Sequence, residues 1–459
     1  MASHFRYFRE LADPNRLAIH VDSTHDVADP MEESPNSSIP FSQVPSRIAS
    51  TNQWHFDVSA NHGSISDDAG EVRSALRRPE DFPAVSAAIA PGDRVALAVD
   101  PNLPSLLEIL RGVLSEIEAA GAEAVDIVLW DEATDATTQM LETEFKGRAT
   151  ILRHDSTHRE SLRYLGADVD AEPVYLNRAI ADADFVLPIV TARPWDAAPN
   201  RHLSGVYPML ADADTRIRHL ESLWKMSDSD LKLGEENRGQ NETQIGWMLG
   251  VQVMMAVAAS EEGLAGRVFA GTPETIRRSF VLARHRGDEY PPSAKLVIAS
   301  LEGNQQQQTW ANFARALMTA ANHAASGGTI LVWTDLQQPP SDRLIYRLNN
   351  NESIDEHDSS NTFDQDAKSE DGFTIWDPSV GLARILERVL AESRVLIKSQ
   401  LDRDSVEALG FGVIESLEGV EHLSRSFEDC ETLRAAQFAS GTFDSLGFDS
   451  LPTITKRSS

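Results

Sequence analysis

Residues 71–104 read EVRSALRRPEDFPAVSAAIAPGDRVALAVDPNLP, and this stretch decides the fold class. Its pattern predicts a helix that leads through a Pro91-Gly92-Asp93 turn into a buried strand over 94–99. The strand ends at a loop that opens with Asp100 and contains Asn102. Because loops at the carboxyl ends of strands line the ligand crevice of open α/β sheets, Asp100 and Asn102 become candidate substrate-binding residues.

Apolar runs and amphipathic segments alternate along the rest of the chain. Strands alternating with helices predict an α/β fold of two domains, each with a mainly parallel sheet flanked by helices, with a cleft between them. The predicted strands cover 94–99, 124–130, 150–153, 185–190, 295–300, 329–333 and 394–398. The predicted helices cover 106–120, 160–165, 272–285, 309–325 and 380–392.

Polar stretches set the expected domain limits. Residues 1–50, rich in Pro, Ser and acidic residues, are expected to form a flexible N-terminal arm. An N-terminal α/β domain follows over 51–235, and a C-terminal α/β domain over 240–440. The latter carries an acidic insertion at 349–372 that reads as a solvated segment. A polar tail covers 441–459.

Composition narrows the classes of function. The formal net charge of −30 argues against nucleic acid and anionic membranes as partners. No apolar run approaches the 18 or so residues of a membrane span, and the N-terminus lacks the apolar core of a signal peptide, so the cytoplasm is the expected location. The only cysteine, Cys430, excludes an internal disulfide and a cysteine-cluster metal site, and we expect it to be a packed helix residue.

Several motifs occur in the order typical of one known family. They are GAEAVDIVL at 121–129, PVYLNR at 173–178 followed by Ala183-Asp184, RVFAGTPE at 267–274 and AKLVIAS at 294–300. From about residue 52 to 419 this order resembles the nickel-pincer lactate racemase family. The resemblance implies two α/β domains around a nickel-pincer nucleotide that is tethered to a lysine. It also implies two histidines that serve as acid and base in the isomerisation of a 2-hydroxy acid.

The chain departs from the family at the residues that carry this chemistry. Leu103 stands where the family has a substrate-binding arginine, and the turn with the family's first catalytic histidine here reads WDEATD, at 130–135. No lysine occurs from Ala149 to Trp224, so a cofactor tethered in the family's manner is excluded. Which cofactor, if any, the chain uses is therefore left open.

The resemblance still points to candidate residues. His202, in the loop before Ser204-Gly205, and His219 are the candidate catalytic histidines, and His219 is also the counterpart of the nickel ligand. An exposed helix histidine is the alternative for His219. Asn312 and Arg315 correspond to the family's substrate-contacting Gln and Lys, and an arginine can bind a carboxylate bidentately. A solvent-facing helix arginine is the alternative for Arg315.

Two further clusters have two interpretations each. Asp131, Glu132 and Asp135 follow a predicted strand, where carboxylates can act as bases or metal ligands, or can mark a helix N-terminus. His154 and His158 have the i, i+4 spacing of zinc sites, but Asp155 and Ser156 favour a helix start that separates them.

Three hypotheses of function follow. The chain is a lactate racemase-like protein that has lost the family's catalysis and binds a small hydroxy acid, another small anion or a partner. Alternatively, it is an active racemase or epimerase that holds its cofactor non-covalently. In a third interpretation it is an unrelated α/β protein.

Overall fold

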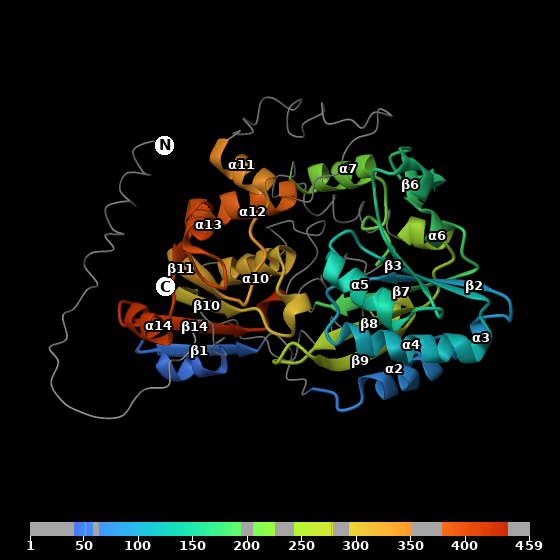
Figure 1. Cartoon of the computed structure of the whole chain (residues 1–459), viewed down its shortest axis with the longest axis horizontal. Coiled ribbons are helices and arrows are strands. Elements are labelled where there is room, and N and C mark those ends of the chain that lie inside the picture. Colours follow the sequence, from blue (N-terminus) through green and yellow to red (C-terminus); the bar gives the residue numbers. More distant parts are fainter. Residues whose placement is uncertain are drawn as a thin grey trace. The chain divides into compact units, whose positions relative to one another are not determined.

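The computed structural model (Figure 1) describes residues 41–50, 52–57, 64–193, 205–224, 243–276, 278, 293–350 and 379–438. The chain divides into two units, 1–38 and 39–459, and all described residues belong to the second. In the described part of the chain, strands form two six-stranded sheets and one two-stranded hairpin. The α/β class with mainly parallel sheets, predicted from the alternation of apolar runs, is confirmed.

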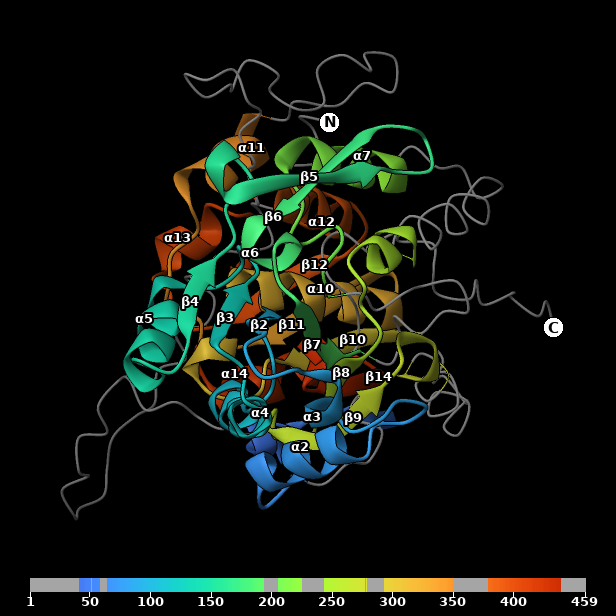
Figure 2. The same ribbon diagram turned by 90° about the vertical axis from the view of Figure 1, so that its right-hand side faces the viewer.

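The first sheet has the strand order β4-β3-β2-β7-β8-β9, which can be followed in Figure 2. All of its pairings are parallel except that of β8 with β9. The strands are β2 (Arg94–Val99), β3 (Ala124–Leu129), β4 (Thr150–Arg153), β7 (Phe185–Ala192), β8 (Met254–Ala259) and β9 (Ala265–Gly271).

The second sheet has the order β1-β14-β10-β11-β12-β13, and every pairing in it is parallel. Its first strand comes from the beginning of the described chain and pairs with its last strand. The strands are β1 (Asn52–Asp57), β10 (Ala294–Ser300), β11 (Ala324–Trp333), β12 (Arg394–Lys398), β13 (Gly412–Val413) and β14 (Asp429–Arg434).

Helices follow the strands, as parallel pairing requires. Several begin at a side chain that accepts a hydrogen bond from the first turn: Thr134 from Thr137 N at the start of α5, and Thr309 from Asn312 N at the start of α10. The helices are α2 (Asp68–Arg77), α3 (Val85–Ala88), α4 (Leu106–Ala120), α5 (Asp135–Glu144), α6 (Arg178–Ala181), α7 (Ala213–Trp224), α10 (Trp310–His323), α11 (Asp342–Asn350), α12 (Ser379–Glu392), α13 (Arg403–Glu407) and α14 (Leu417–Ser424).

The central strands of the two six-stranded sheets are buried on both faces, which explains why they read as continuous apolar runs. In β2, Leu97 packs with α4 and the helices on its face, whereas Ala96 and Ala98 face a second cluster that contains Leu210. In the second sheet, Val297 faces α10 and α12, and Leu296 faces a cluster that includes Phe41 and Val44.

Two positions predicted to be helical differ from the sequence-based expectation. The segment 160–165, predicted as a helix, forms a short 3₁₀ turn, η4 (Arg159–Ser161), and the strand β5 (Leu162–Ala167), which pairs with β6 (Pro173–Asn177). Cys430, expected in a helix, lies in β14, where strand partners on both sides override local helix propensity.

Residues 41–50, assigned by composition to the N-terminal arm, fold against the second sheet. Two 3₁₀ turns, η2 (Phe41–Gln43) and η3 (Pro45–Arg47), place Phe41, Val44 and Ile48 in the core. The expected interdomain break at 235–240, the acidic insertion after 350 and the tail at 441–459 lie outside the described residues. No helix in the described ranges is long and apolar enough to cross a membrane.

Candidate functional site

The first sheet contains a topological switch point between β2 and β7. From β2 the chain continues to β3 and β4 on one side, and later returns to β7 on the other side. Connections therefore leave the carboxyl ends of β2 and β7 in opposite directions, which is where open α/β sheets bind ligands. Asp100 follows β2 and Arg193 follows β7 at this point.

Asp100 and Arg193 form a buried ion pair at the switch point. Arg193 Nη1 donates to Asp100 Oδ2 over 3.0 Å, and the side chains are only 2% and 0% exposed. The backbone N–H groups of Asn102 and Thr191 also donate to this carboxylate. Burial by itself would raise the pKa of Asp100, but the positive charges of Arg193 and Arg315 and the hydrogen bonds outweigh it, so the pKa lies below its ordinary value.

Glu132, three residues after β3, joins the first sheet to α10. Arg315 Nη2 lies 2.8 and 2.7 Å from the two carboxylate oxygens of Glu132, and both side chains are buried. Asn102 Nδ2 donates to Glu132 Oε2 over 2.8 Å, and Arg315 Nη1 donates to Asn312 Oδ1 over 3.0 Å. These contacts bring the four predicted substrate-binding residues together with Glu132 in one buried network: Asp100, Asn102, Asn312 and Arg315.

Gln307, which received no role from the sequence, completes this buried network. Its Nε2 donates to the carbonyl oxygens of Asn102 and Leu103, over 3.1 and 3.0 Å. Its own carbonyl groups accept from Asn312 Nδ2. The Leu103 side chain is fully buried in the core with α4, so its position faces the hydrophobic interior.

The remaining acidic residues after β3 are paired as well. Asp131 Oδ2 accepts from Arg216 Nη1 over 2.7 Å, and Asp135 begins α5 and pairs with Arg153. Asp135 thus supports the helix N-terminus interpretation, whereas Asp131 and Glu132 are partners of arginines from other elements.

His154 follows β4 and is buried. Its Nε2 lies 2.8 Å from the carbonyl oxygen of Ala211, and its Nδ1 lies 3.3 Å from Asn177 Nδ2. Burial, followed by the positive charge of Arg216, lowers the pKa of His154 to about 4. His154 is therefore neutral at neutral pH, with Nε2 as donor and Nδ1 as acceptor.

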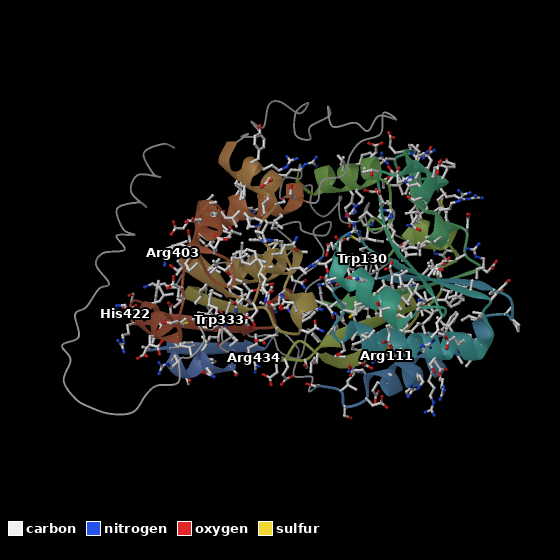
Figure 3. The ribbon with its side chains drawn as sticks, viewed as in Figure 1. Arg111, Trp130, Trp333, Arg403, His422 and Arg434 are labelled. Carbon is white, nitrogen blue, oxygen red and sulfur yellow. The ribbon has the colours of Figure 1, made fainter. Side chains whose placement is uncertain are left out.

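Of the two candidate catalytic histidines, the structure describes only His219. His219, in α7, is buried, and its ring meets the ring of Tyr207 edge-on at 6.0 Å, so the exposed-histidine alternative is not what the structure has. His202 lies outside the described residues. Trp130, labelled in Figure 3, donates from Nε1 to the carbonyl oxygen of Gly205 over 3.0 Å and thereby links the end of β3 to the segment that leads to α7.

The described residues contain no group of three or more His, Cys, Asp or Glu side chains arranged to hold a metal ion. Cys430 is not a nucleophile candidate either. Burial and the nearby carboxylates of Glu431 and Asp429 raise the pKa of its thiol to about 12.

Fold and site together define a class: an α/β protein with two mainly parallel sheets and a buried charged network at the carboxyl ends of the first sheet. Residues 43–192 match the family model described as Lactate racemase N-terminal domain. The predicted resemblance to the lactate racemase family is thus confirmed over this segment. A search of curated proteins finds no match.

Solved structures support the same fold over most of the chain. The lactate racemase apoprotein from Thermoanaerobacterium thermosaccharolyticum is 13% identical, with a TM-score of 0.58, over 88% of this chain and 96% of that one. A structural-genomics protein from Thermotoga maritima is 11% identical, with a TM-score of 0.51, over 77% and 93% of the two chains. At these identities the likeness is one of fold alone.

Besides Gln307, sequence reasoning assigned no role to Arg193. The available signal was its position, because an arginine directly after the apolar run 185–192 lies at the carboxyl edge of a buried sheet.

Proposed function

We propose that this protein is a lactate racemase-like binding protein that holds a small hydroxy acid or a related small anion and no longer performs the family's isomerisation. The observation that carries the proposal is the commitment of the expected substrate-contacting groups to one another. Arg315 grips Glu132 with a bidentate contact, and Asn312 is held between Arg315 and Gln307. These contacts hold the side chains in fixed positions. Fewer groups therefore remain that could act on a substrate during turnover.

The residues present do not fit a lysine-tethered pincer cofactor. No lysine occurs from Ala149 to Trp224, and Leu103, in place of the family's loop arginine, is part of the apolar core. The buried imidazole of His154 is neutral at neutral pH and holds backbone and amide groups. We therefore derive no step that involves such a cofactor.

A second candidate is an isomerase with a non-covalently held cofactor. It is favoured by His219, which is buried beside Tyr207 at the same side of the sheet as Arg216. An imidazole nitrogen is a suitable nickel ligand.

One experiment separates the two candidates. Purified protein is analysed for nickel by mass spectrometry and assayed for racemisation of D- and L-2-hydroxy acids by chiral chromatography, with His219→Ala and Arg94→Gln measured in parallel. The binding proposal expects substoichiometric nickel and no racemisation by any of the three proteins. Racemisation that His219→Ala abolishes and Arg94→Gln preserves would establish the isomerase instead.

A further inference from the structure

The guanidinium of Arg193 uses one of its edges for Asp100. Nη1 donates to this carboxylate, whereas Nε and Nη2 are buried and have no hydrogen-bond partner among the residues that the structure describes. The side chain is 2% exposed, so bulk water does not reach these groups. A buried N–H group without an acceptor lowers stability, and a charged one does so more strongly.

Two other arginines in the same protein show which partner this edge fits. Arg77 binds Glu116 through Nε and Nη2, over 3.0 and 2.7 Å. Arg148 binds Glu118 through the same two atoms, over 2.7 and 2.8 Å. In each case a planar carboxylate accepts two parallel hydrogen bonds, and this is the edge that Arg193 leaves unused.

Asp100 keeps this edge in place. Its carboxylate is ionised, is fixed by the N–H groups of Asn102 and Thr191, and holds Nη1 of Arg193. The pair stands at the topological switch point between β2 and β7, where ligands enter such sheets. The guanidinium is thus oriented before any ligand binds, which reduces the entropic cost of binding.

We infer that Arg193 is the residue that selects the ligand, by binding a carboxylate bidentately through Nε and Nη2. This inference rests on the proposed binding function and adds the group that the ligand must carry. Small carboxylates such as acetate and lactate present two coplanar oxygens at the required spacing. A spherical anion such as chloride fits this edge less well, since it offers a single centre to two donors.

The test uses the full chain with sodium acetate and sodium L-lactate as probes and sodium chloride at matched ionic strength as the reference. Dissociation constants come from isothermal titration calorimetry. Arg193→Lys keeps the charge beside Asp100 but removes the two-donor edge, and we expect it to weaken acetate binding by about ten-fold or more. Arg94→Lys, an exposed arginine at the start of β2, is the matched control and should bind as the wild type does.

A second measurement does not depend on the variant folding. In wild-type protein labelled with ¹⁵N-arginine, acetate should shift the Nε–H resonance of Arg193, and chloride at the same concentration should not. Equal acetate affinities of wild type and Arg193→Lys, or an Nε–H resonance that chloride shifts equally, would overturn the role of Arg193 and leave the binding function standing. If neither acetate, lactate nor any other small anion binds the wild type, the proposed function itself fails.

Discussion

Asp100 holds the switch point together because it combines a position at the end of β2, full burial and a negative charge. It ends β2, donates its backbone N–H to Ile189 of β7 and accepts three hydrogen bonds on its carboxylate. The sequence predicted its location because a buried strand followed by a Pro-containing loop marks a sheet edge. It did not predict Arg193 as partner, since the two residues are 93 positions apart and only the β2–β7 pairing brings them together.

This ion pair makes stability depend on pH in a definite direction. The folded-state pKa of Asp100 lies below its unfolded value, so its stabilising contribution is complete above about 3.9 and is lost as the pH falls through the folded-state pKa. Asp100→Asn leaves the Arg193 charge buried without its counter-ion and should cost about 3–5 kcal/mol at pH 7. The difference from wild type should narrow below about pH 4.

Urea unfolding at pH 7, 5 and 3.5 measures this difference. Asp135→Asn, which changes an exposed aspartate of the same sheet edge, should differ from wild type by at most about 1 kcal/mol at each pH. A penalty for Asp100→Asn that stays constant from pH 7 to 3.5 would contradict the prediction.

At the scale of elements, apolar runs predicted the strands that are buried on both faces, and β2, β4 and β12 have the predicted limits. The prediction failed where a partner decides the structure. Residues 162–167 form a strand because β6 pairs with them. The strand β8 has the sequence MMAVAA, with few β-branched residues, so its extended form depends on the pairing with β7 and β9. In both cases the pairing partner, more than the residues of the segment itself, decides the extended form.

Gly112 allows the close approach of α4 and α2, two helices that pack on the first sheet. A Cβ atom on this residue of α4 would lie 2.8 Å from Cβ of Val72 and 2.9 Å from the carbonyl oxygen of Ala69, both in α2. Gly112→Ala should therefore destabilise the fold by about 1–3 kcal/mol, although alanine is the better helix former. Gly246→Ala is the matched control, since this helical glycine has open space around it, and it should stabilise by up to about 1 kcal/mol. If thermal unfolding shows both variants to be less stable than the wild type, or both to be more stable, this account of Gly112 is wrong.

At the scale of the whole molecule, the contact of Glu132 with Arg315 ties the first sheet to a helix of the second. Their hydrogen bonds span 183 positions of the sequence, and the Gln307 side chain adds contacts to Asn102 and Leu103. The resemblance pointed to Arg315 as a substrate residue, and that role stays a prediction. Its structural partner could not be foreseen, because Glu132 had been interpreted within a local acidic cluster.

The labelling rate of Cys430 can test whether this contact couples the opening of the two sheets. As the only cysteine, buried in β14 with a thiol pKa of about 12, it should react with a thiol reagent only when the second sheet opens. Glu132→Gln weakens a buried ion pair of the first sheet, and removal of one partner costs about 3–5 kcal/mol, so labelling should accelerate by about 100-fold or more.

Glu118→Gln serves as the control for that experiment. It alters a bidentate contact with Arg148 that is substantially exposed, and labelling should change by less than about five-fold. If Glu132→Gln lowers the urea midpoint but leaves the labelling rate of Cys430 at the wild-type value, the two sheets open independently.

The pairing of β1 with β14 has a consequence for the order in which the chain can fold during its synthesis. Asn52 lies opposite Asp429, so β1 leaves the ribosome long before its partner strand exists. At about 5–20 residues per second, it waits on the order of tens of seconds. All strands of the first sheet emerge within that interval and can pair, whereas the second sheet closes only when translation nears its last described residues. A nascent chain stalled before residue 429 should thus contain one finished sheet and one that lacks β14, the strand that joins β1 to β10.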